Sequence, residues 1–200
     1  MTAVTFAKTL DMPREEWLEL RRQGIGGSDS AAIVGLDRYR SAFDVYAEKI
    51  GLKPEQPDNE AMRQGRDLEQ YVAERFMEAT GKKVRRRNAM LQHPEYPFMT
   101  ANIDRWVVGE NAGFEAKTTS VLNRCKFSQG EFPPNYYVQC VHYMAVTGAE
   151  RWYLAVLVLN NAFHVFTIER DDAEIQALIE AEKDFWENHV LKQIPPAPDG

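Results

Sequence analysis

The 200-residue sequence lacks the features of several large protein classes. It has two cysteines, Cys125 and Cys140, which are too few for a four-cysteine iron–sulfur cluster and form no CxxC pair. We expect both to be free thiols in a reducing compartment. No apolar run reaches the roughly 18 residues needed to cross a bilayer, and residues 1–10 lack the apolar core of a secretory signal. These absences predict a cytoplasmic protein with no membrane contact.

Three common catalytic motifs are also missing. The four histidines show no HExxH spacing, the glycines at 24–27 are not followed by the Gly-Lys-Ser/Thr of an ATP-binding loop, and Ser28 does not stand in a G-x-S-x-G elbow. The sequence therefore gives no support to a zinc peptidase, a P-loop ATPase or a serine hydrolase.

The balance of charge is acidic, with 30 Asp and Glu against 24 Lys and Arg and a net charge of −6. This argues against a protein that coats nucleic acid, but it allows an enzyme with one local basic channel. The densest basic segment is residues 82–87, Lys-Lys-Val-Arg-Arg-Arg. It fits either a solvated strand edge or a surface that follows phosphates.

Hydrophobic periodicity predicts an α/β fold in one domain, residues 1–200. Apolar residues recur at helical spacing over 60–80, and further helices are expected over 13–23, 135–147 and 171–190. Two shorter helices are expected where Ser28 or Asp29 caps a segment that stops at Gly35, and where Ser41 caps one that ends at Gly51. Strand patterns cover 84–91, 98–108, 114–119, 152–159 and 163–168. This order predicts a mixed central β-sheet flanked by helices. We divide the domain into an N-terminal helical part (1–58), a core (59–190) and a proline-containing tail (191–200).

The most informative residues lie on the hairpin predicted around the turn 109–113. Asp104 is near the end of one strand, and Glu115 is near the start of the next, with Lys117 on the same face as Glu115. Two carboxylates held close together favour a cation between them, and hard oxygen ligands suit Mg²⁺, with Mn²⁺ as a substitute. The same residues also fit ordinary surface ion pairs.

A third acid, Glu69, stands at the edge of the apolar stripe of the helix 60–80. An acid at such a position needs a partner, because an unpaired buried charge is costly. Two partners fit: a salt bridge to an arginine such as Arg66, or a metal-bound water beside Asp104 and Glu115. We favour the second.

These residues resemble the PD-(D/E)xK nuclease superfamily. Ile103-Asp104, ten intervening residues and Glu115-Ala116-Lys117 match its core motif, with Ile103 in place of the usual proline. Other motifs resemble those of phage lambda exonuclease and YqaJ-type recombination exonucleases: Trp17, Arg21 and the Gly-Gly-Ser-Asp of residues 26–29, then Gly65 with Glu69. Gln139 and Tyr143 resemble the Gln-x-x-x-Tyr motif of RecB-type nucleases. The resemblance spans residues 17–143 and implies a restriction-endonuclease-like core.

The resemblance also implies roles for individual residues. Asp104, Glu115 and the Ala116 carbonyl would bind the metal, Lys117 would assist the attacking water, and Glu69 would position a metal-bound water. The terminal 5′-phosphate would be held by Arg21, Ser28 and Asn102, and Gln139 and Tyr143 would support the site. Simpler interpretations stay open: a surface charge for Arg21, a helix N-cap for Ser28, a polar helix position for Gln139 and packing for Tyr143.

The predicted function is that of a Mg²⁺-dependent 5′-to-3′ exonuclease that degrades one strand of linear double-stranded DNA and leaves 3′ overhangs for phage-type recombination. By resemblance, it would form a homotrimer and work with a single-strand annealing protein in the cytoplasm of a bacterial host, from a phage or prophage. Two alternatives remain: an endonuclease on the same core, and a catalytically inactive module that binds DNA ends.

Overall fold

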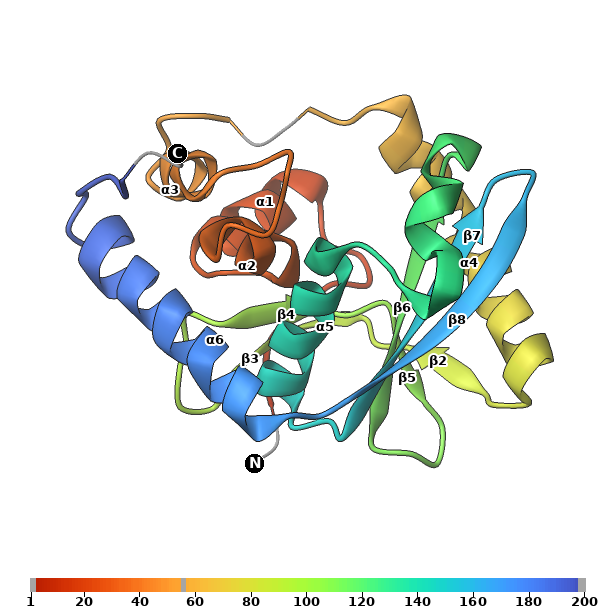
Figure 1. Ribbon diagram of the computed structural model, residues 1–200. Helices are drawn as coiled ribbons and strands as arrows, with labels where there is room; N and C mark the ends of the chain where they lie inside the picture. The colour runs from red at the N-terminus through yellow and green to blue at the C-terminus, as the bar shows by residue number, and fades with distance from the viewer. Residues whose placement is uncertain (1–2, 55–56, 198–200) are drawn as a thin grey trace.

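The computed structural model describes residues 3–54 and 57–197, and its strands form two sheets (Figure 1). The five-stranded sheet has the order β2-β5-β6-β7-β8 and the three-stranded sheet the order β1-β3-β4. The strands are β1 (Val4–Lys8), β2 (Val84–Arg86), β3 (Ala89–Gln92), β4 (Thr100–Asn102), β5 (Arg105–Val107), β6 (Ala112–Thr119), β7 (Arg151–Val158) and β8 (Ala162–Glu169). The predicted mixed α/β architecture is confirmed, because β6 and β7 are parallel and the other pairs antiparallel.

Two predicted strands are each divided between the sheets. The predicted strand 84–91 is β2 followed by β3, and the predicted strand 98–108 is β4 followed by β5. The same two chain segments pair with each other in both sheets. Arg86 is opposite Arg105 in the larger sheet, and Met90 is opposite Asn102 in the smaller one. Three residues (87–89) thus lie opposite two (103–104). The bend that this mismatch requires holds Asp104 between the sheets.

The larger sheet is covered on both faces, which explains the apolar sequence of β7. Tyr153 and Ala155 pack on one face with Val72 and Phe76 from α4 (Glu60–Thr80). Residues of the other parity, Trp152, Leu154 and Val156, join the largest core cluster with α5 (Pro134–Thr147) and α6 (Asp172–Asp184). The site described below lies on this second face.

Short helices occupy the N-terminal part (Figure 1), and the second of them packs against α5 and α6. They are α1 (Arg14–Arg22), α2 (Gly27–Ile33) and α3 (Ala42–Lys49). The helices predicted from the sequence are present. The last reaches Val190 as predicted, although its final segment, Phe185–Val190, is π-helical. A 3₁₀ segment, Val121–Gly130, and strand β1 were not predicted. Within the part of the chain that the structure describes, no helix combines the length and apolarity of a membrane span.

Candidate functional site

The two acids of the predicted hairpin lie side by side. The register that pairs Arg105 with Phe114 brings Asp104 level with Glu115 across β5 and β6. The Asp104 carboxylate accepts a hydrogen bond of 2.9 Å from the backbone N–H of Ala116. The sequence-based pairing of Asp104 with Glu115 is therefore present in the structure, although Asp104 belongs to a bend and not to a strand.

The electrostatics of this pair favour a cation. Burial raises the pKa of Asp104 well above its usual value, the Glu115 carboxylate raises it further, and the Ala116 N–H opposes the rise. Glu115 is 4% exposed, and within residues 3–54 and 57–197 its Oε2 atom is buried without a hydrogen-bond partner. A buried carboxylate oxygen with no donor, next to a second carboxylate, is a costly arrangement that a divalent cation would relieve.

Lys117 and Gln139 satisfy the other oxygen of Glu115. The Lys117 ammonium lies 2.7 Å from Glu115 Oε1 and donates to Gln139 Oε1 at 2.8 Å. Gln139 Nε2 in turn donates to Glu115 Oε1 at 2.9 Å and to the Tyr143 hydroxyl at 2.8 Å. The Tyr143 hydroxyl donates to the Asn102 carbonyl at 3.3 Å. These contacts make Gln139 and Tyr143 parts of the site and not merely residues of a helix face.

Lys117 stays protonated in this setting. Burial disfavours its ammonium, but the adjacent Glu115 carboxylate raises the pKa of Lys117 well above its usual value. The ammonium also lies 5.3 Å from the centre of the Tyr136 ring, on its cation-binding face. Lys117 is therefore a fixed positive charge that can stabilise charge developing on a substrate, rather than a base.

Glu69 has a partner that the sequence analysis did not identify. Its Oε1 atom accepts from Arg105 Nη2 at 3.0 Å, while Arg66 pairs with Asp58. The alternative of a salt bridge to an arginine is therefore present, but with Arg105 in place of Arg66. The favoured role of Glu69 beside a metal-bound water stays a prediction. Among the described residues, no three His, Cys, Asp or Glu side chains cluster closely enough to hold an ion alone. A cation at Asp104 and Glu115 would need additional ligands, such as a backbone carbonyl, water or substrate phosphate.

A second group of predicted residues surrounds the start of α2. The N-cap of this helix is Gly26, whose N–H donates to Asp29 at 3.0 Å. Ser28 is inside the first turn, so its interpretation as an N-cap is wrong. Its hydroxyl instead accepts a 2.8 Å hydrogen bond from Arg21 on α1. The pair joins a guanidinium to a hydroxyl at a helix N-terminus, an arrangement suited to an anion.

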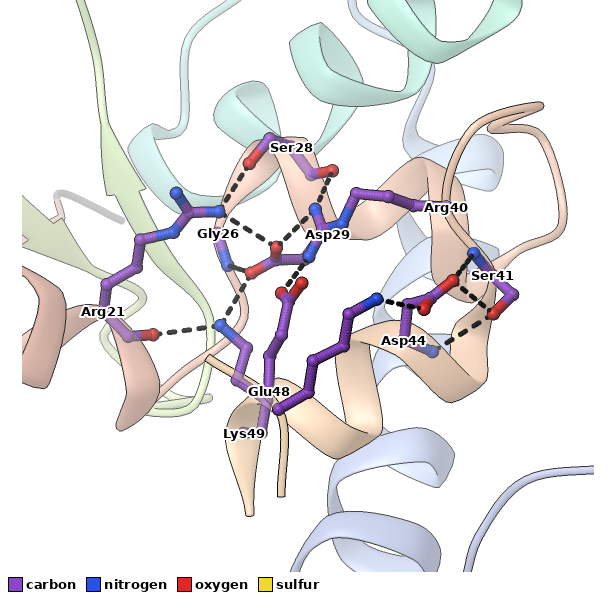
Figure 2. Close-up of polar contacts among 10 residues, drawn as sticks. Arg21, Gly26, Ser28, Asp29, Arg40, Ser41, Asp44, Glu48 and Lys49 are labelled. Carbon is purple, nitrogen blue, oxygen red and sulfur yellow. Dashed lines mark hydrogen bonds and ion pairs between the residues drawn. The ribbon is translucent and has the colours of Figure 1, made fainter. Parts of the chain in front are cut away.

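Asp29 is a functional candidate that the sequence analysis missed (Figure 2). It is fully buried, and its carboxylate lies 3.1 Å from Arg21, 3.1 Å from Arg40 and 2.8 Å from Lys49. Burial opposes its charge, but the three cations, Lys49 first, hold the pKa of Asp29 well below its usual value. Arg40 also pairs with Glu48. The sequence signals were its place in the Gly-Gly-Ser-Asp motif, to which no role was given, and its position three residues after Gly26, the usual place for a carboxylate in a first helical turn.

The two groups line one cavity of about 190 Å³, which includes Arg21, Ser28, Asn102, Asp104 and Glu115. A second cavity, of about 580 Å³, shares Trp17, Arg21, Ser28 and Asn102 with the first. It adds further cationic side chains, namely Arg14, Arg40 and Arg66. The carboxylate pair and the Arg21–Ser28 pair therefore face the same space.

Gly27 allows this convergence. A Cβ atom at Gly27 would lie 2.6 Å from the Tyr143 ring and 3.0 Å from Gln139 Cγ. Any larger residue would push α2 away from α5 and separate the two groups. The glycine of the Gly-Gly-Ser-Asp segment thus serves close helix packing as well as the turn.

Known protein structures share this fold. The structure is similar to an alkaline exonuclease (LHK-Exo) from Laribacter hongkongensis, with a TM-score of 0.77 and 24% identity over 90% of this chain and 94% of that one. It is also similar to a phage-related exonuclease from Haemophilus somnus 129PT, with a TM-score of 0.64 and 10% identity over 88% and 99% of the two chains. The fold is therefore that of these exonucleases.

The family follows from the sequence. Residues 16–150 match the YqaJ-like viral recombinase domain, and the chain belongs to this family. It is 45% identical over 201 aligned residues to the uncharacterized protein YqaJ of Bacillus subtilis (strain 168). The match covers 99% of this chain but 63% of that protein, so the chain spans less than two thirds of its relative. The predicted resemblance to YqaJ-type exonucleases is confirmed.

Proposed function

We propose that the protein is a Mg²⁺-dependent exonuclease that degrades one strand of double-stranded DNA from its 5′ end. One observation carries the proposal: Arg21 and Ser28 line the same small cavity as Asp104 and Glu115. A terminal phosphate held by the first pair would leave the next phosphodiester near the second. The fold of known exonucleases and membership of a viral recombinase family support this assignment.

The proposed hydrolysis releases one nucleotide in each cycle. The oxygen of water bonds to the phosphorus of the second nucleotide, the bond from that phosphorus to O3′ of the terminal nucleotide breaks, and O3′ takes a proton from the water. A 5′-mononucleotide leaves, and the new end again carries a 5′-phosphate. Lys117, fixed on Glu115 and Gln139, would stabilise the negative charge that develops on the phosphoryl oxygens. Each cycle of hydrolysis regenerates the 5′-phosphate that Arg21 and Ser28 would bind.

A divalent cation fits the acidic pair. Asp104 and the unpartnered Oε2 of Glu115 would hold it, with the Ala116 carbonyl as a further oxygen ligand. When bound, Mg²⁺ supplies positive charge for the attacking water and the leaving oxygen. Glu69 lies near enough to raise the pKa of Asp104, and we propose that it orders water beside the pair.

The test of the activity uses linear duplex DNA and covalently closed circular DNA, each with Mg²⁺, with Mn²⁺ and with EDTA. The proposal predicts mononucleotide release from linear DNA with either metal, no release in EDTA, and intact circles. Nicked or cut circles would assign the site to an endonuclease. Binding of DNA ends without nucleotide release in either metal would assign the protein to end binding alone.

Arg21→Ala is predicted to remove the preference for phosphorylated ends. The wild type should degrade 5′-phosphorylated duplex faster than 5′-hydroxyl duplex by about tenfold or more, because a charge-assisted hydrogen bond to phosphate contributes about 1.5–3 kcal/mol. Initial rates on the two substrates measure this ratio. Arg22→Ala is the matched control, since Arg22 is the next residue of α1 and pairs with Glu19. An equal loss of rate on both ends in Arg21→Ala would contradict the assignment.

We also propose that the protein acts in phage-type recombination in the cytoplasm of a bacterial host, as a homotrimer that hands its 3′ overhang to a single-strand annealing protein. Its family, named for viral recombinases, supports this setting. Light scattering of the purified protein tests the trimer, and co-purification with an annealing protein encoded beside it tests the partner. A monomer at all concentrations would overturn the trimer.

A further inference from the structure

The basic segment 82–87 separates into paired and unpaired cations. Lys82 pairs with Glu110, and Arg86 lies 3.9 Å from Glu69. Lys83, Arg85 and Arg87 are exposed, and none of the three forms a side-chain hydrogen bond or ion pair with any residue in 3–54 and 57–197. In a chain of net charge −6, an unneutralised row of three cations is a marked local exception.

The strand register places Arg85, the middle residue of this row, on the face of the sheet that carries the candidate active site. Arg85 is opposite Trp106, and Trp106 is opposite Gly113. Gly113 has the same parity along β6 as Glu115 and Lys117, so all these side chains project to one face. Figure 1 shows β2 at the edge of the five-stranded sheet, where a large ligand can approach.

Arg85, in the middle of the row, lies within reach of a short duplex bound at the site. Two strand spacings and four residues along β6 separate the Cα atoms of Arg85 and Lys117 by about 16 Å. With a rise of about 3.4 Å per base pair, this corresponds to about five base pairs of duplex. Arg87 follows β2 in the direction of Asp104, because Arg86 is already level with Arg105. The row therefore leads toward the acidic pair.

We infer that Lys83, Arg85 and Arg87 form a contact surface for the phosphate backbone of the duplex that is about to be degraded. This rests on the proposed function and names the residues that hold its uncut substrate. Charge complementarity argues for DNA, since a duplex offers regularly spaced negative charges and unpaired cations on a strand edge release its counterions. The bound duplex would extend from Asp104 and Glu115 along β2.

The test compares Arg85→Ala/Arg87→Ala with Lys183→Ala/Lys192→Ala. Lys183 and Lys192 are exposed cations, and Lys183 belongs to α6, which lies on the opposite side of the molecule from β2 (Figure 1). Binding of a long blunt duplex is measured by fluorescence anisotropy in EDTA over a range of KCl concentrations, so that no cleavage is needed. The Arg85/Arg87 variant should reduce the slope of log K against log salt by about 1.8 and weaken binding by about tenfold or more near 0.1 M salt. The control variant should keep the wild-type slope.

Two comparisons make the result specific. A hairpin duplex shorter than about five base pairs reaches Arg87 beside Asp104 but not Arg85. The variant should therefore lower the salt slope of this duplex by about 0.9, half the change expected on the long duplex. Light scattering should give both variants the wild-type mass. An unchanged slope on the long duplex would overturn the inference, as would an altered mass, which would assign the row to contact with a second copy. Because binding is read without metal, a protein that releases no nucleotide but shows the reduced slope would contradict only the proposed exonuclease function.

Discussion

Lys117→Ala is expected to lower the rate of nucleotide release by about 100- to 1,000-fold, the usual effect of removing one charge that stabilises a developing anion. The ammonium of Lys117 is fixed by Glu115 and Gln139, and the adjacent carboxylate keeps it protonated. Single-turnover cleavage of a 5′-phosphorylated duplex measures the chemical step. End binding in EDTA should change little, since Arg21 and Ser28 remain.

Two further variants separate the charge of Lys117 from its packing. Lys117→Met keeps most of the side-chain volume without the charge and should be as slow as Lys117→Ala. Lys183→Ala removes an exposed lysine from α6 and should cleave at the wild-type rate. A near-normal rate in Lys117→Ala, with a folded protein, would show that this ammonium has no role in the chemistry.

Asp29→Ala is expected to cost about 3–5 kcal/mol of stability, because it leaves the buried Lys49 ammonium without its counter-charge. The Lys49 side chain is 2% exposed and lies 2.8 Å from Asp29, so water cannot replace the carboxylate. For a chain of this size the loss corresponds to a fall in Tm of about 6–20 °C. Thermal unfolding followed by circular dichroism measures it.

Asp44→Ala is the matched control for Asp29→Ala (Figure 2). Asp44 caps α3 with Ser41 and pairs with Lys53 at the surface. Removing it should cost only about 1 kcal/mol, the usual contribution of a cap and an exposed pair. Equal losses of stability in the two variants would show that the buried network around Asp29 contributes no more than an exposed cap and ion pair.

Asp29 also predicts a dependence of stability on pH. Its cations hold the folded-state pKa well below the unfolded value of about 3.9. The stabilisation is therefore complete above about pH 4 and is lost as the pH falls through the folded-state pKa. The Asp29→Asn variant lacks this titration, so its stability should approach that of the wild type under acid conditions. Urea unfolding at a series of pH values tests this, and parallel curves would contradict it.

The sequence predicted those parts of the site that depend on local pattern. The hairpin turn and the alternation along β6 are local, and they suffice to place Asp104, Glu115 and Lys117 together. The bend at Asp104 was not predicted, because it arises where two strand pairs pass from one sheet to the other with unequal numbers of residues.

Contacts between segments that are distant in the chain could not be predicted from local sequence patterns. The partners of Asp29 come from α1, the loop before α3 and α3 itself, which meet only when the helices pack. Glu69 pairs with Arg105, which is 36 positions away in the chain. No local spacing favours that ion pair over one between Glu69 and Arg66. Buried His142 lies between Glu182 on α6 and the Thr100 carbonyl on β4, a link that no periodicity shows.

The most direct test of the account is the fate of a label at each end of a linear duplex with Mg²⁺, beside a closed circular control. The account predicts early release of the 5′ label as a mononucleotide, a 3′ label that persists on a shortening strand, and an intact circle. Early loss of the 3′ label with the 5′ label retained would contradict the assignment of Arg21 and Ser28 to the 5′-phosphate and, with it, the proposed direction of degradation.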